Sequence, residues 1–275
     1  MLKTSEQMTV ATPSGRTFLP HAVVRLLKGL YMFLMFTAFG AALVFGHLMS
    51  PFLLLYDRLA GRSFHRNQNY FRGFFVLWLW FMKMGGLLKI LPPKGQSIEG
   101  PCVVVANHPG LFDILVLICS IPKLSLIAKR PLKTMLGMKY LFELAGWIFA
   151  TNNTDASMAM ETTNKAVAVI KQGYKFMLFP EGTRSPKSGL HRFKVGAFKL
   201  ARLANVPIQP VLIRNTPPFL PHEDRWYYPP YETSTIQIEF MEPIPAPQEK
   251  EERAAASRVE YLFRSALGID KTSGT

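Results

Sequence analysis

The stretch VVVANHPGLFDILVL, residues 103–117, holds one histidine and one aspartate in an otherwise apolar run. Its β-branched beginning predicts a buried strand over 102–107, and its end has apolar residues at helical spacing. Pro109 suits the first position of a helix, so we predict that the strand passes directly into one. Because helical side chains lean toward the N-terminus of their helix, we expect Asp113 to reach back to His108.

The predicted contact between His108 and Asp113 has a chemical meaning. An imidazole that is held by a carboxylate through one ring nitrogen presents the other nitrogen as a general base. Such a base removes a proton from an attacking hydroxyl, and the protein then needs no nucleophile of its own. Short spacings of this kind also arise by chance, so the pair gains weight only from its surroundings.

Outward from this stretch, short β-rich runs alternate with amphipathic stretches. Strands are predicted over 102–107, 124–128, 147–152, 174–180, 206–213 and 235–241. Helices are predicted over 110–120, 130–146, 155–173 and 194–205. This alternation indicates an α/β fold, with a mixed, mainly parallel sheet flanked by helices. A final helix over 249–268 is expected to dock by one apolar face.

The N-terminal part of the chain points to a membrane. Gly29–Ser50 runs for 22 residues without Lys, Arg, Asp or Glu, about 33 Å of helix and enough to span hydrocarbon. We expect a membrane-embedded helix or re-entrant hairpin, followed by an interfacial segment over 74–91 that is rich in aromatic residues. A buried core helix is the alternative. Basic residues are more numerous after the apolar run than before it, which favours a catalytic domain on the cytoplasmic face.

The amino-acid composition indicates the charge of the expected binding partner. The chain has 32 Lys and Arg against 18 Asp and Glu, a formal charge of +14, which favours an anionic partner. A cluster of arginines lies between two apolar stretches, so anionic lipid is favoured over nucleic acid. The cluster comprises Arg58, Arg62, Arg66 and Arg72. Two cysteines, Cys102 and Cys119, make no disulfide framework, and no histidine has the spacing of a metal ligand, so no metal site is expected.

A second motif, LFPEGTRS at 178–185, follows a predicted strand. Strand ends carry binding groups in sheets of this kind. Gly182 allows close backbone approach, Thr183 offers a hydroxyl and an amide, and Arg184 can grip a phosphate with two donors. The spacing is not that of a nucleotide P-loop. An ordinary surface turn is the alternative, since turns favour these residue types.

Taken together, these motifs resemble the glycerolipid acyltransferase family, typified by 1-acylglycerol-3-phosphate (lysophosphatidate) acyltransferases. The resemblance covers about residues 98–215. NHPGLFD (107–113) resembles the family's N-H-x-x-x-x-D block, FPEGTRS (179–185) its phosphate-binding block, FKVGAFKLA (193–201) the segment that follows, and VPIQPV (206–211) its apolar fourth block. Lys129 matches the basic position of the second block.

The resemblance implies a function and roles for single residues. His108 would be the general base and Asp113 its orienting carboxylate, while Lys129, Glu181, Gly182, Thr183 and Arg184 would bind the acceptor. The implied reaction moves an acyl group from acyl-CoA or acyl carrier protein to the hydroxyl of a lysophospholipid in the membrane, in phospholipid biosynthesis. No further cofactor is implied. No G-x-S-x-G elbow is present, which argues against a serine hydrolase.

One departure from the family leaves the acceptor open. Family members that act on glycerol phosphates commonly carry an arginine where this chain has Asn152. The alternatives are therefore a lysolipid without a terminal phosphate, or a non-catalytic lipid-binding membrane protein. We divide the chain into a polar tail (1–27), a membrane-embedded and interfacial segment (28–92), a catalytic domain (93–248) and a C-terminal helix with its tail (249–275). Deletion of residues 1–90 is expected to leave a soluble but poorly active domain.

Overall fold

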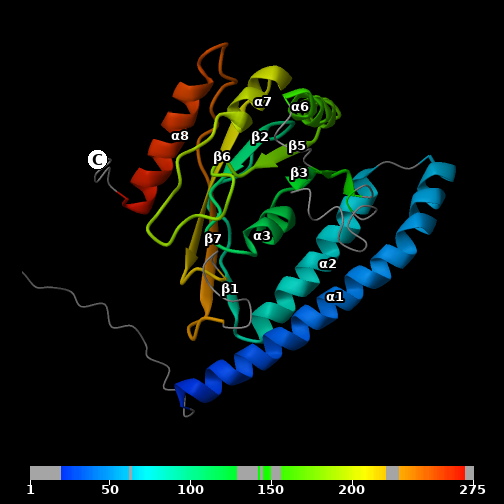
Figure 1. Cartoon of the computed structure of the whole chain (residues 1–275), viewed down its shortest axis with the longest axis vertical. Helices are drawn as coiled ribbons and strands as arrows, with labels where there is room; N and C mark the ends of the chain where they lie inside the picture. Colours follow the sequence, from blue (N-terminus) through cyan, green and yellow to red (C-terminus); the bar gives the residue numbers. More distant parts are fainter. Residues whose placement is uncertain are drawn as a thin grey trace, which may run out of the picture.

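The computed structural model describes residues 20–61, 64–128, 142, 145–149, 156–220 and 229–269. Its centre is a seven-stranded mixed sheet with the order β1-β7-β6-β2-β5-β3-β4 (Figure 1). The strands are β1 (Leu88–Ile90), β2 (Val103–Ala106), β3 (Leu124–Ala128), β4 (Ile148–Phe149), β5 (Lys175–Leu178), β6 (Ile208–Thr216) and β7 (Ser234–Phe240). Strands β6, β2, β5, β3 and β4 are parallel, whereas β7 runs antiparallel to β6 and parallel to β1.

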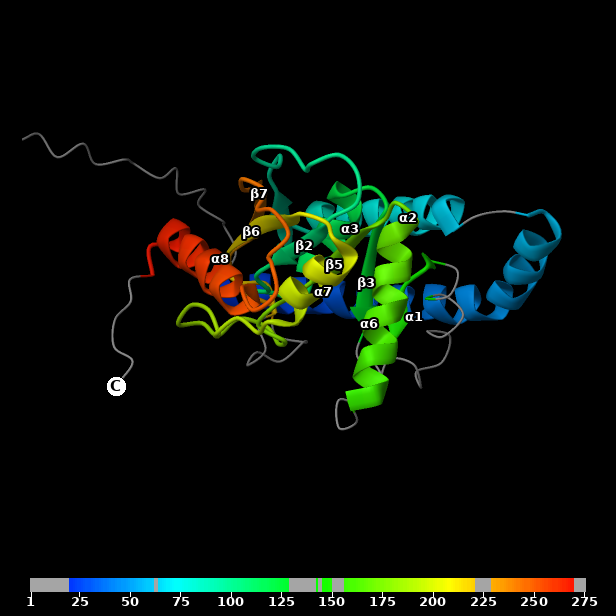
Figure 2. The same cartoon turned by 90° about the horizontal axis from the view of Figure 1, so that it is seen from above.

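Helices cover both faces of the sheet (Figures 1 and 2). They are α1 (His21–Leu59), α2 (Phe64–Met84), α3 (Asp113–Ser120), α6 (Ala156–Lys171), α7 (Gly196–Ala204) and α8 (Glu252–Leu267). Alternate residues of β2 face opposite layers, as the pleat of a strand requires. Val104 and Ala106 pack with α2 and α3, whereas Val103 and Val105 pack with α6, α7 and α8. Because β2 is buried on both sides, its sequence reads as a continuous apolar run.

The structure confirms the predicted α/β class and each predicted strand within the described residues. The predicted strand over 147–152 is described only at Ile148–Phe149, and the predicted helix over 130–146 lies almost wholly outside the described residues. One strand was not predicted. β1 lies inside the range 74–91, which the sequence assigns to an interfacial segment, and Leu88 is 2% exposed. That assignment is therefore wrong at its end, because these residues complete the sheet.

Helix α1 is a single helix of 39 residues that continues through Pro51. Proline has no N–H to donate to the carbonyl four residues earlier, which is that of His47. The hydroxyl of Ser50, fully buried, donates to this carbonyl at 2.8 Å. A side chain thus supplies the hydrogen bond that the backbone lacks, and the helix continues instead of ending at the proline.

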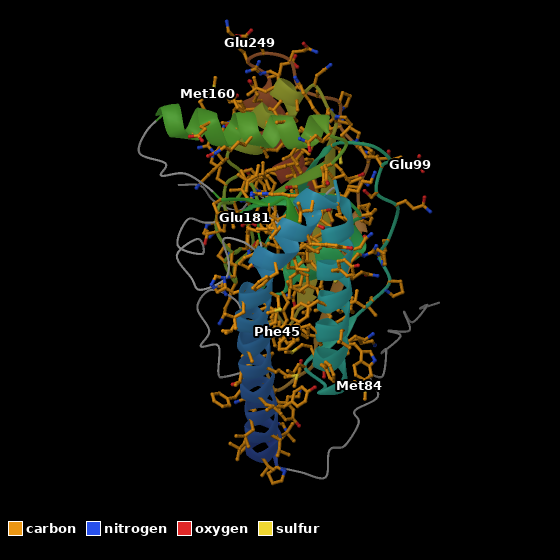
Figure 3. The ribbon with its side chains drawn as sticks, turned by 90° about the vertical axis from the view of Figure 1, so that its right-hand side faces the viewer. Phe45, Met84, Glu99, Met160, Glu181 and Glu249 are labelled. Atoms are coloured by element: carbon orange, nitrogen blue, oxygen red, sulfur yellow. The ribbon has the colours of Figure 1, made fainter. Side chains whose placement is uncertain are left out.

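Helices α1 and α2 form an antiparallel hairpin along one face of the sheet (Figures 1 and 3). Phe39 of α1 contacts Trp78 of α2, with ring centroids 4.8 Å apart, and the Tyr31 hydroxyl donates to the Phe81 carbonyl at 2.7 Å. Most large apolar side chains of α1, including Phe45, remain exposed. By length and composition α1 could cross a membrane, and only 6% of its most apolar window is buried.

The hairpin also belongs to the core of the sheet domain. Met32 of α1 and Met82 of α2 are fully buried. The other core side chains before residue 91 are Phe75, Trp78, Leu79, Leu87 and Leu88. The structure therefore argues against the expectation that residues 1–90 can be removed to leave a soluble domain.

We predict that a chain of residues 91–275 will not fold stably. Burial of seven large apolar side chains contributes about 10–20 kcal/mol, which is as large as the whole stability of a typical domain. Size-exclusion chromatography and near-ultraviolet circular dichroism of the truncated chain should show aggregation and lost tertiary packing. A monodisperse monomer with the full-length near-ultraviolet spectrum would contradict this prediction.

Candidate active site

His108 and Asp113 meet at the carboxyl end of β2, as the sequence predicts, but by a different backbone path. Helix α3 begins at Asp113 and not at Pro109. The Leu111 N–H donates across the sheet end to the Phe219 carbonyl at 3.1 Å, and the Gly110 N–H donates to the Asp113 carboxylate. These two bonds tie the segment into an irregular turn, so the predicted direct passage from strand to helix is wrong.

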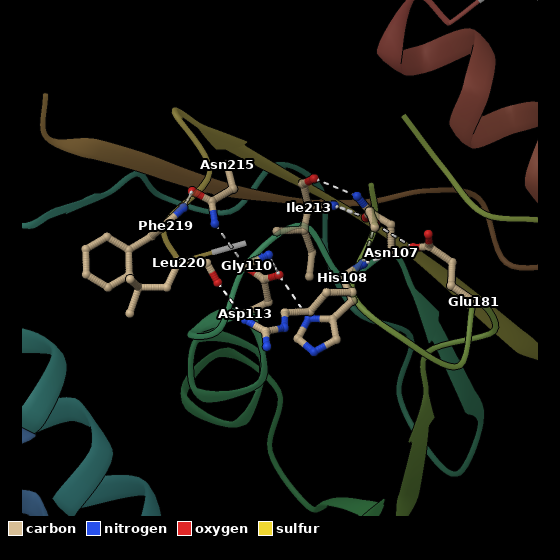
Figure 4. A network of polar contacts seen from close by, with 11 residues as sticks. Asn107, His108, Gly110, Asp113, Glu181, Ile213, Asn215, Phe219 and Leu220 are labelled. Atoms are coloured by element: carbon tan, nitrogen blue, oxygen red, sulfur yellow. Dashed lines mark hydrogen bonds and ion pairs between the residues drawn. The ribbon is translucent and has the colours of Figure 1, made fainter. Parts of the chain in front are cut away.

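The carboxylate of Asp113 is fully buried and accepts three hydrogen bonds (Figure 4). Oδ2 lies 3.1 Å from His108 Nδ1 and 2.5 Å from the Gly110 nitrogen, and Oδ1 accepts from Asn215 Nδ2 at 3.2 Å. Burial raises the pKa of Asp113, while the hydrogen bonds from His108, Gly110 and Asn215 oppose the rise. All three bonds favour the charged carboxylate, which in turn fixes the imidazole hydrogen on Nδ1.

The imidazole of His108 is held on one face and open at one edge. Its ring stacks on Phe179, which follows β5, with centroids 4.1 Å apart and planes 9° from parallel. The side chain keeps 18% of its surface exposed. With Nδ1 directed at Asp113, Nε2 presents its lone pair away from the carboxylate. The arrangement is that of a general base ready to take a proton from a bound hydroxyl.

Glu181 is also part of this site, where its carboxylate is bonded to the protein's own donors. It is 3% exposed, and Oε1 accepts from the His108 backbone N–H at 3.2 Å and from the Ser185 hydroxyl at 2.6 Å. Oε2 accepts from the His191 N–H at 2.9 Å. Both oxygens thus hold the backbone of the turns that carry His108 and Ser185. Its assignment to acceptor binding stays a prediction, while in the structure this carboxylate organises the site from within.

The turn after β5 brings two cations near these residues. Gly182 has φ +75°, and a Cβ placed there would lie 2.6 Å from Lys194 Nζ, so the lysine ammonium rests directly over the glycine. Arg184 Nη1 donates to the Leu220 carbonyl at 2.8 Å, and among the described residues the other guanidinium N–H groups remain for a ligand. Thr183 is half-buried in the same turn. The predicted ligand Lys129 and the departure at Asn152 both lie outside the described residues.

Sequence reasoning missed two residues of this site. Asn215 ends a strand that reads as apolar, and Lys194 lies in a segment recognised only as following the phosphate-binding motif. A polar residue at the carboxyl end of a buried parallel strand is the signal that could have identified Asn215, because ligand sites form at that edge. No local pattern places Lys194 over Gly182, since this contact depends on the path of the loop between them.

Comparisons with known proteins agree with this geometry. A human 1-acyl-sn-glycerol-3-phosphate acyltransferase beta is 30% identical over 173 residues, covering 60% of each chain. A human protein named lysophospholipid acyltransferase LPCAT4 is 28% identical over 209 residues, covering 70% of this chain and 39% of its own length. The chain spans between 39% and 60% of the length of the curated relatives it matches.

A solved structure shares the fold. The 1-acyl-sn-glycerophosphate acyltransferase PlsC of Thermotoga maritima superposes with a TM-score of 0.67 at 22% identity, covering 93% of this chain and all of that one. The family model described as Acyltransferase matches residues 88–214, from β1 to the last residues of β6. That range contains His108, Asp113 and the turn of Arg184. Over these residues, and in the geometry of the pair, the chain is similar to the acyltransferase family.

Proposed function

We propose that this protein is a membrane-bound O-acyltransferase that transfers a fatty acyl group from an acyl thioester to the hydroxyl of a lysophospholipid. The observation that carries the proposal is the buried Asp113 carboxylate holding His108 with Nε2 open. An intact pair of this kind argues against a non-catalytic lipid-binding protein. The names of the relatives support acyl transfer to glycerophospholipid acceptors.

In the proposed reaction, Nε2 of His108 removes the proton of the acceptor hydroxyl as its oxygen attacks the thioester carbonyl. A tetrahedral intermediate forms, the carbon–sulfur bond breaks, and the imidazolium returns its proton to the leaving thiolate. The products are an ester and a free thiol, carried by coenzyme A or an acyl carrier protein. The Asp113 carboxylate stabilises the imidazolium while it exists and keeps the imidazole in the reactive tautomer.

We propose 1-acyl-glycerol-3-phosphate as the acceptor, with phosphatidate as the product. Its phosphate would be bound by the open N–H groups of Arg184 and by the ammonium of Lys194. Glu181 does not oppose this binding, because both its oxygens face backbone and hydroxyl donors. Lys129 would add a third cation.

A second acceptor class is a lysolipid without a terminal phosphate. Asn152 favours it, since a phosphate-binding arginine is commonly found at that position in the family. Purified protein should therefore be offered lysophosphatidate and lysophosphatidylcholine, each with acyl-CoA and with acyl carrier protein, and the products read by mass spectrometry. We expect phosphatidate to be the main product. No acylated product from any of the four pairs would refute the proposed function.

The exposed apolar surface of α1 supports a membrane location, because both the acceptor and the product are lipids. Acyl thioesters are held in the cytoplasm, so we propose that the catalytic domain lies on the cytoplasmic face. The α1–α2 hairpin would then hold the site beside the lipid headgroups, with the phospholipid membrane as the partner.

We predict that His108→Ala will lower kcat by about 10²–10⁴-fold, the usual cost of losing a general base. Asp113→Asn should also be severe, because the imidazole loses the carboxylate that stabilises its positive charge. Initial rates on lysophosphatidate, with thermal unfolding as the control for folding, test both variants. A folded His108→Ala variant with near wild-type turnover would show that His108 is not the base.

We predict that Lys194→Gln will raise the KM for lysophosphatidate about 10-fold or more, since a hydrogen bond to a charged group contributes about 1.5–3 kcal/mol. Lys199→Gln is the matched control, because Lys199 is an exposed lysine of the following helix α7. The same two variants should be assayed on lysophosphatidylcholine, where the effect is expected to be smaller. Equal KM values for the Lys194 and Lys199 variants would exclude Lys194 from the phosphate site.

A further inference from the structure

Asn215 is a buried residue of β6 that joins the catalytic carboxylate to a neighbouring loop (Figure 4). Its side chain is 6% exposed. Nδ2 donates to Asp113 Oδ1 at 3.2 Å, and Oδ1 accepts from the Phe219 backbone N–H at 3.2 Å. Both ends of the amide are therefore engaged, one by the carboxylate and one by the backbone.

The contact with Phe219 fixes which way round the amide lies. A backbone N–H can only donate, so the side-chain oxygen of Asn215 must face Phe219, and its NH₂ group must face Asp113. An NH₂ group in turn can only donate, so Asp113 Oδ1 must be an acceptor. Oδ2 already accepts from the Gly110 N–H. The donors around Asp113 therefore fit a carboxylate at both oxygens.

The backbone around Asn215 leaves little freedom for another arrangement. A Cβ at Gly110 would collide with Asn215 Nδ2 and would lie 2.7 Å from the Phe219 carbonyl oxygen. The Phe112 and Phe219 rings stack with centroids 5.1 Å apart. The turn before α3 and the segment after β6 thus pack tightly against each other, with the Asn215–Asp113 hydrogen bond between them.

We propose that Asn215 is a positioning residue for the acyl transfer, which holds the Asp113 carboxylate in the orientation that makes His108 a base. The proposal rests on the proposed function of the same pair. Asn215 acts through Asp113, and its amide is bonded to Asp113 and Phe219 rather than directed at the position of a substrate hydroxyl.

Loss of this amide should make the pair retain its proton to higher pH. Without the Asn215 donor, the Asp113 charge is less stabilised and attracts a proton on the imidazole more strongly, so the reactive form appears only at higher pH. The other charged groups near the pair within the described residues are Glu181, on the His108 backbone, Arg184, on the Leu220 carbonyl, and Lys194, over Gly182. None of them is altered when Asn215 is replaced, so a shift of the pH profile reports the loss of the amide.

The experiment compares Asn215→Leu and Asn215→Asp with the control Gln209→Leu. Gln209 is a fully buried amide at the opposite end of β6, where it donates to the Met241 carbonyl at 2.6 Å and accepts from the Ile98 N–H at 3.1 Å. Gln209→Leu removes side-chain hydrogen bonds to the backbone, as Asn215→Leu does, but Gln209 has no hydrogen bond to Asp113. It should lower the melting temperature and leave the pH profile of kcat/KM unchanged.

For Asn215→Leu we expect the acidic limb of the kcat/KM profile to move up by about one pH unit, and for Asn215→Asp by more, because a second carboxylate adds a like charge. One unit lowers kcat/KM about tenfold at pH values below the limb. The KM for the acceptor should change less than threefold. An acidic limb that stays in place in both folded variants would overturn the proposal, even if kcat falls.

A second measurement needs no substrate and can be made on variants that are less stable than the wild type. The imidazole resonance of His108, assigned by its disappearance in His108→Ala, is titrated by nuclear magnetic resonance in the detergent-solubilised full chain. The side chain introduced by Asn215→Asp has the same shape as the native one. In this variant the midpoint of the imidazole resonance should lie at a higher pH than in the wild type. An unchanged midpoint would overturn the role of Asn215. If the midpoint of the variant is shifted but the wild-type protein has no acyltransferase activity, the proposed function is refuted and the role of Asn215 in positioning Asp113 stands.

Discussion

The buried charge of Asp113 is the constraint on which the arrangement of this site depends. An ionised carboxylate removed from water is costly unless donors surround it, and here three donors come from two parts of the chain. The turn after β2 supplies His108 and Gly110, and the end of β6 supplies Asn215. These segments are 102 residues apart in the chain, measured from Asp113 to Asn215, so the requirement of one carboxylate joins the carboxyl ends of two neighbouring strands, β2 and β6.

Glu181 fixes the backbone of the site by accepting hydrogen bonds, as Asp113 fixes the imidazole of His108. Its two oxygens connect the turn after β2 with the turn after β5, through His108, Ser185 and His191. The Ser185 N–H donates in return to the His108 carbonyl at 2.8 Å. A buried carboxylate that is engaged at both oxygens by backbone and hydroxyl donors rigidifies the turns it joins. His108 is thus held at its side chain by Asp113 and at its main chain by Glu181.

The sequence was informative where a single element decides the outcome. The alternation of strands and helices follows from periodicity, and His108 and Asp113 lie only five residues apart, so their contact was within reach of local reasoning. Local reasoning failed where a contact joins segments that are distant in the sequence. The irregular turn at Gly110 depends on Phe219, the role of Glu181 depends on the position of His108, and Asn215 has a meaning only beside Asp113.

The α1–α2 hairpin shows the same limit. Apolar composition marks α1 as a membrane candidate, but composition cannot tell that Met32 and Phe36 turn inward while Phe45 stays exposed. Phe36 contacts Phe112, the residue before Asp113, with ring centroids 6.1 Å apart. The strand β1 was missed for a similar reason: three residues are too few to show a period, and they form a strand only because β7 lies beside them.

The pairing of β1 with β7 has a consequence for biosynthesis. Leu88 lies opposite Ser234, and Lys28 of α1 donates to the Tyr231 carbonyl 203 residues later in the chain. β1 therefore leaves the ribosome before its partner β7, and this edge of the sheet is completed only after β7 has been made. Contacts of such long sequence separation form late, and an unpaired apolar edge invites aggregation in the interval. In the proposed membrane location, the bilayer would shelter the exposed apolar side chains of the α1–α2 hairpin until β7 has been made.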